Sequence, residues 1–94
     1  MKKLFELSVR GSVYFYLSTI SEEQMFKLKQ FASQFYRSNP VYENKPDDEI
    51  AEYFTASAKQ KFDIELESIP VSAVFVINKQ KVSEITNFRD FYIT

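Results

Sequence analysis

The stretch VRGSVYFYLSTISEEQ, residues 9–24, decides the fold, because a glycine turn, an aromatic strand and a helix start follow one another in it. Residues 13–17, VYFYL, are apolar or aromatic at every position, which is typical of a strand covered on both faces. Gly11 precedes this run, and Ser21 with Gln24 has the spacing of a capping box. The stretch therefore predicts a turn, a central strand and a helix in that order.

A second strand is predicted before the turn. Residues 3–9, KLFELSV, alternate between apolar and polar side chains, the pattern of a half-buried strand, and we place it at a sheet edge. A two-residue loop at Gly11 and Ser12 would put Phe15 on the polar face of this strand. A three-residue loop that ends at a left-handed Gly11 pairs Phe5 with Phe15 instead, so we expect that loop.

Apolar spacing predicts two main helices. The first begins after Ser21 and ends before Pro40, and its apolar stripe comprises Met25, Leu28, Phe31, Ala32, Phe35 and Tyr36. Phe26 lies off this stripe, so it is either covered by another element or exposed as a contact residue. The acidic start PDDE, residues 46–49, opens the second helix, whose apolar face is Ile50, Phe54, Ala58 and Phe62.

The remaining segments are mostly extended in this interpretation. We expect a short extended segment at residues 41–42, a strand or connector after about Lys61, a second run that is apolar on both faces at residues 73–77, and a weaker strand at 82–86. Pro70 suggests a fixed turn or a cis bond before the buried run. Residues 87–94 are expected to form a short helical turn that lays Phe88, Phe91 and Tyr92 on the sheet.

Together these elements predict an α/β or α+β domain with a sheet of about four to five strands and two main helices. Two strands that are apolar on both faces favour helices on both sides of the sheet and parallel neighbours. The length of 94 residues, 45% of them hydrophobic, suits a single domain over residues 1–94.

Composition excludes several classes of chemistry. The chain has no cysteine and no histidine, which removes disulfides, thiol chemistry, imidazole bases and the usual zinc sites. Its single glycine cannot build a phosphate-cradling loop or a dinucleotide fingerprint. The longest apolar runs are far shorter than the roughly 20 residues that span a bilayer. We therefore expect no catalysis, no cofactor and no membrane span.

Two carboxylate clusters are the remaining candidates for metal or acid–base chemistry. Neither residues 47–49 nor the alternating acids of residues 63–67 have metal-loop spacing. Helix-start electrostatics explain the first cluster better, and a solvated strand face explains the second. Both are expected to be structural.

Nucleic acid is not an expected partner. Residues 1–45 carry seven basic and four acidic side chains, and residues 46–94 carry five and nine, a split too small for non-specific nucleic-acid binding. Counted from Arg10, the stacking positions of an RNA-recognition motif are Ser12, Tyr14 and Leu17, so one aromatic of three is present. Tyr14 and Tyr16 are therefore expected under a helix and not on a stacking platform.

The N-terminal residues bear on the cellular compartment. Glu6 and Arg10 interrupt the apolar segment that a signal peptide would need in MKKLFELSVR. Without a targeting signal we expect a cytoplasmic protein.

Two segments resemble the thioredoxin-like superfamily. VYFYLSTISEEQMFKLKQFA is similar to its first core strand and helix, and FDIELESIPVSAVFVINKQKVSEI is similar to its segment around a cis proline. The resemblance implies that Pro70 is that proline and that Ile20 to Glu23 occupy the place of the Cys-x-x-Cys motif. The sequence there is ISEE, so the implied core is redox-inactive.

Within that superfamily the chain looks most like the TrbC-type proteins of F-type conjugative pilus assembly, through YLSTISEEQ, ESIPVSAVFV and ITNFRDFY. A ferredoxin-like α+β sandwich is the alternative fold.

The function we expect is a non-catalytic protein-binding domain in a conjugation or secretion assembly, with another protein or a second copy of this chain as its partner. Its predicted contact residues are Ile20, Ser21, Phe26, Ile69, Pro70, Phe91 and Tyr92. The alternatives are a small inhibitor from a phage or mobile element that acts on a host nuclease or defence complex, and an RNA-binding module.

Overall fold

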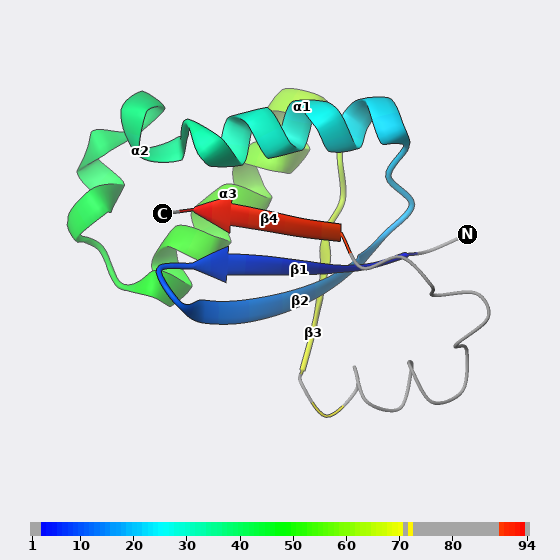
Figure 1. The fold of residues 1–94 in the computed structure, drawn as a ribbon, viewed down its shortest axis with the longest axis horizontal. Coiled ribbons are helices and arrows are strands. Elements are labelled where there is room, and N and C mark those ends of the chain that lie inside the picture. Colours follow the sequence, from blue (N-terminus) through cyan, green and yellow to red (C-terminus); the bar gives the residue numbers. More distant parts are fainter. Residues whose placement is uncertain (1–2, 71, 73–88, 94) are drawn as a thin grey trace.

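The structure is a computed structural model that describes residues 3–70, 72 and 89–93. Four strands form one sheet in the order β3-β2-β1-β4, with β1 antiparallel to β2 and parallel to β4, and β3 antiparallel to β2 (Figure 1). Their bounds are Lys3–Val9 for β1, Ser12–Ser18 for β2, Glu67–Ile69 for β3 and Arg89–Ile93 for β4. The α-helices are α1 at Glu22–Ser33, α2 at Phe35–Ser38 and α3 at Asp47–Phe62, with a 3-10 turn η1 at Pro40–Asn44. The molecule is a small α+β protein, which confirms the predicted class at that level.

The hairpin between β1 and β2 closes through a two-residue loop at Arg10 and Gly11. Both residues have positive φ, 52° and 98°, as a tight hairpin turn requires. The register therefore pairs Phe5 with Tyr16 and Glu6 with Phe15. Both loops weighed from the sequence are wrong, because Val9 and Ser12 pair in the ladder and leave Arg10 and Gly11 as the turn.

β1 lies inside the sheet and not at its edge, which corrects a second expectation. β4 pairs with the side of β1 that β2 leaves open. Residues 89–93 are thus a strand and not the expected helical turn, and Phe91 and Ile93 point into the core. β2 is interior as predicted, although Val13 at its start is 44% exposed.

Both main helices begin where local chemistry predicts. Ser21 and Gln24 form the complete capping box of α1, on which Met25, Leu28, Phe31 and Ala32 are buried. The predicted helix is interrupted at Gln34, so Phe35 and Tyr36 of the predicted stripe belong to α2. α3 begins at Asp47 with three acidic residues in its first turn, and Asp63 in a left-handed conformation ends it. Residues 41–42 belong to η1 and are not extended, because Pro40 starts a helical turn there.

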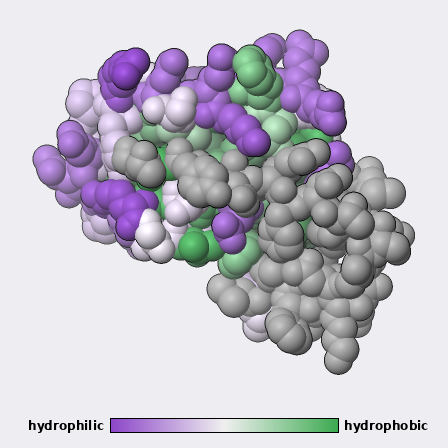
Figure 2. Space-filling model, in the orientation of Figure 1, coloured by the Kyte–Doolittle hydropathy of each residue, from purple (hydrophilic) through white to green (hydrophobic). Residues whose placement is uncertain are grey.

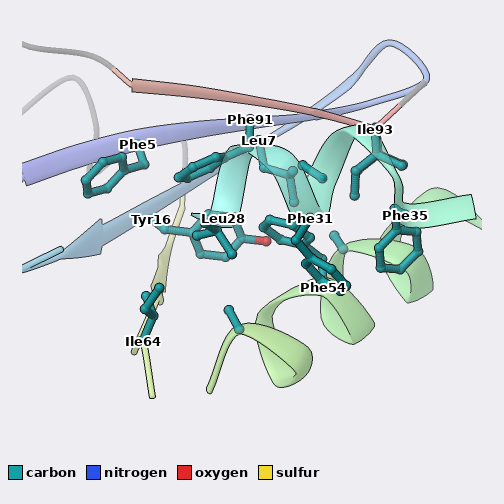
Figure 3. Packing of buried hydrophobic residues seen from close by; sticks show 14 of the residues in the cluster. Phe5, Leu7, Tyr16, Leu28, Phe31, Phe35, Phe54, Ile64, Phe91 and Ile93 are labelled. Atoms are coloured by element: carbon teal, nitrogen blue, oxygen red, sulfur yellow. The ribbon is translucent and has the colours of Figure 1, made fainter. Parts of the chain in front are cut away.

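The core lies between the sheet and the helices, and rings from both layers meet in it (Figure 3). Phe54 of α3 stacks on Phe31 of α1 at 5.7 Å between ring centroids and contacts Phe91 of β4 at 5.9 Å. Leu4, Phe15, Leu17 and Ile69 make a smaller cluster apart from this core. In the described ranges the helices pack on one face of the sheet, not on both as expected.

Two of the predicted strands cannot be compared with the structure. The strands predicted at 73–77 and 82–86 lie outside the described residues. Among the helices that are described, none has the length and apolar character needed to cross a membrane.

Candidate functional site

Ser21, a predicted contact residue, is placed by the first turn of α1. Its hydroxyl accepts a hydrogen bond from the Gln24 amide at 3.2 Å, and its own amide donates to Oε1 of Gln24 at 3.0 Å. Both polar groups of Ser21 are thus used to start the helix. Ile20 beside it is buried in the core.

A groove runs between α1 and α3 beside this helix start. One hollow of about 590 Å³ is lined by Ser21, Gln24, Lys27, Lys61, Phe62 and Asp63, among others. A second hollow of about 280 Å³ shares Lys27 and Phe62 with it and continues along α1 to Gln34. We call the two together the α1–α3 groove.

Aromatic rings form the floor of the α1–α3 groove and polar side chains form its rim. Phe31 meets the edge of Phe62 at 5.8 Å between centroids, and the Lys61 ammonium lies 4.9 Å from the centre of the Phe31 ring. On the rim, Lys27 and Glu23 form an exposed ion pair at 3.9 Å, which contributes little to stability.

Phe26 projects from α1 next to this groove. Its residue surface is 63% exposed, and it is adjacent to Lys27 in sequence and one helical turn from Gln30, both of which line the groove. Figure 2 shows a hydrophobic side chain among hydrophilic ones along this helix. Of the two alternatives that the sequence left open for Phe26, covered or exposed as a contact residue, the structure shows the exposed one.

The other predicted contact residues are not gathered at this groove. Phe91 is buried at 1% exposure, and Tyr92 contributes backbone to β4 while its side chain lies outside the described part of the chain. Ile69 is half-buried and pairs with Phe15 of β2, which precedes Ile20 by five positions. Of the predicted contact residues, the structure thus places Ser21 at the start of α1 and Phe26 on its exposed face, and the others elsewhere.

Pro70 is exposed directly after β3. The peptide bonds of the described residues are all trans, including the bond before Pro70. This differs from the cis proline that the resemblance implies.

The two carboxylate clusters have structural roles. Asp47 is bound by Ser12 and Arg10, whose hydrogen bonds hold the pKa of its carboxyl below the ordinary value. Lys59 lies 3.0 Å from Asp63 and 3.1 Å from Glu65, and these partners raise the pKa of Lys59. Within the described ranges no group of three or more acidic side chains is arranged to hold a metal ion.

Arg10 makes long-range contacts that the sequence analysis did not predict. Its guanidinium donates to the Asp47 carboxylate at 2.8 Å and to the carbonyl oxygens of Glu43 and Lys45 at 2.8 and 2.5 Å. These partners are 33 to 37 residues away in the chain, so no local spacing announces them. We call this set, with Ser12, the Arg10 clasp.

Tyr14 and Tyr16 lie on the helix-facing side of β2, as expected. Tyr16 is buried, which raises the pKa of its hydroxyl to about 12, and Tyr14 is half-buried. They do not form an exposed stacking platform.

Comparisons with known proteins do not add a relative. Neither a protein-family model, nor a curated protein, nor a solved structure matches this chain. Function is therefore argued from the geometry alone.

Proposed function

We propose that the chain is a non-catalytic protein-binding domain whose contact surface is Phe26 with the adjoining α1–α3 groove. The exposure of Phe26 carries this proposal. Phe26 is exposed on the otherwise polar outer face of α1, and covering an exposed aromatic ring with a partner lowers the free energy. Aromatic anchors are also enriched in the centres of interfaces.

The groove has the anatomy that a protein interface needs. Its floor of Phe31 and Phe62 edges is apolar, and its rim of lysine and glutamine side chains can make hydrogen bonds around an inserted side chain. Ser21 offers no free nucleophile there, because its hydroxyl already caps α1. These features favour binding over catalysis.

A redox-inactive thioredoxin-like core in a conjugation or secretion assembly is the finer form of this proposal. The run from β2 into a capped α1 with ISEE at the helix start supports it, as does the parallel pair of β1 and β4. The trans bond before Pro70 departs from that family pattern.

Site-specific photo-crosslinking in the source cells tests the contact surface. A benzophenone amino acid in place of Phe26 should give one discrete adduct with a partner protein or a second copy. The same amino acid in place of Val41, which is 67% exposed on η1, serves as the matched control and should give none.

The substitution Phe26→Ser should remove the partner from the purified complex without changing the thermal unfolding of the chain. Equal adducts from positions 26 and 41 would overturn the assignment of this surface. So would a lone monomer in light scattering, with no adduct from position 26.

A further inference from the structure

A separate hollow lies between β2 and the first half of α3. It has a volume of about 290 Å³ and is lined by Tyr14 and Tyr16 of β2, Asp48, Glu52 and Thr55 of α3, and Ser68 of β3, among others. Pockets that enclose whole drug-sized ligands start at about 300 Å³, so this hollow suits one side chain or a small organic ion. The α1–α3 groove meets α3 at its other end.

The Tyr16 hydroxyl is the first sign that the hollow takes a ligand. Tyr16 is only 4% exposed, yet in the described part of the chain its hydroxyl has no hydrogen-bond partner. Figure 3 shows the side chain leaving β2 with its oxygen directed toward the helices. Among the described residues the fully enclosed side-chain oxygen without a partner is that of Tyr36, so the Tyr16 hydroxyl is not sealed in the core. It opens to the hollow that Tyr16 lines and is available to a group that enters.

Two carboxylates are the second sign. Asp48 and Glu52 are exposed on α3 at a spacing of four residues, where like charges repel. Neither is paired among the described residues, in contrast to Asp47 in the Arg10 clasp. Burial is the largest cause of the raised pKa of both tyrosines. Asp47 and then Asp48 add to it at Tyr14, and Tyr14 and then Glu52 add to it at Tyr16.

Among the described residues the lining therefore combines two aromatic rings, a hydroxyl oxygen without a described partner and two carboxylates, with no lysine or arginine. An ammonium or guanidinium group matches every one of these features. Carboxylates bind it through charge-assisted hydrogen bonds, a phenolic oxygen accepts from it, and aromatic faces attract it.

We propose that this hollow binds the cationic side chain, arginine or lysine, of a protein partner. The site is independent of the surface proposed above, and only the source of the cation rests on the protein-binding function. The two surfaces lie at opposite ends of α3, so a variant that abolishes binding at one surface can still be tested for binding at the other.

Titration of the ¹⁵N-labelled full chain with N-acetyl-arginine amide tests the proposal. We expect saturable amide shifts centred on Tyr14, Thr55 and Ser68, and none with N-acetyl-citrulline amide, which has the same shape without the charge. N-acetyl-lysine amide is a second cationic probe. Asp48→Asn and Glu52→Gln should each weaken binding about fivefold, since each removes one charge-assisted contact.

Glu49→Gln is the matched control, because Glu49 lies in the same helical turn and does not line the hollow. It should leave the affinity unchanged. Agmatine carries the guanidinium without a peptide backbone, and tighter binding of agmatine than of the capped arginine would overturn the assignment to a protein side chain. Equal shifts with citrulline, equal loss in Glu49→Gln, or no saturable shift with either cationic probe would overturn the site itself.

Discussion

Tyr16 has its ring in the apolar core and its hydroxyl at the edge of that core. The ring packs with the buried cluster under the helices, while the hydroxyl lies at the inner end of the hollow between β2 and α3. Burial disfavours the phenolate, so the pKa of Tyr16 rises to about 12. The sequence predicted this burial, because a run that is apolar on both faces belongs inside a sheet.

Tyr16→Phe should leave stability near neutral pH unchanged or raise it by up to about 1 kcal/mol, because no described residue forms a hydrogen bond with the hydroxyl that it removes. Tyrosine ionises near pH 10 in the unfolded chain and near pH 12 at this position. Between these values the unfolded state binds fewer protons, so stability falls as pH rises. Urea unfolding from pH 9 to 12 should show a steeper decline for wild type than for Tyr16→Phe. Parallel declines would show that Tyr16 titrates normally.

At the scale of elements, the sequence predicted where the main helices begin but not the positions of all strands in the sheet. Ser21 and Gln24 fix the start of α1 through contacts three residues apart, and acidic residues fix the start of α3. The position of β1 depends on β4, whose residues lie about 80 positions later in the chain. Local periodicity cannot report such a partner, so β1 was assigned to an edge.

The Arg10 clasp joins two elements, the hairpin turn and the start of α3. Ser12 and Arg10 both bind the Asp47 carboxylate, and the left-handed backbone of Arg10 allows its side chain to reach them. The hairpin register therefore depends on contacts outside the hairpin. This is why turn preferences within residues 9–13 gave the wrong loop.

Asp47→Asn should lower the unfolding midpoint at neutral pH, because it removes the charge that Arg10 binds. The pKa of Asp47 is lowered in the folded chain, first by Ser12 and then by Arg10. The stability it contributes is thus present above its ordinary pKa and is lost as pH falls through the lower folded value. Thermal unfolding across the acid range should show a smaller acid dependence in Asp47→Asn than in wild type. Asp48→Asn is the control, and identical profiles for the two variants would contradict the clasp.

At the scale of the whole molecule, first and last strands meet in the sheet. Parallel pairing of β1 with β4 places Phe91 against Phe5 at 5.7 Å between centroids and against Phe54 of α3. The sequence predicted an aromatic C-terminal segment on the sheet but treated Phe91 as a contact residue. Its role became visible only when the sheet brought three distant segments together. The same holds for the hollow between β2 and α3, whose tyrosines and carboxylates are far apart in the chain.

A matched pair of phenylalanine truncations tests this arrangement. Phe91→Ala should cost about 3 to 5 kcal/mol, because it empties space between sheet and helices, whereas Phe26→Ala should change stability by less than about 0.5 kcal/mol. A chain of this length has a total stability of about 5 to 14 kcal/mol, so Phe91→Ala should bring it near the folding threshold. Urea unfolding of both variants measures the contrast. Since the chemical change is the same, equal losses would mean that β4 does not pack against β1 and α3, and the sheet order would have to be revised.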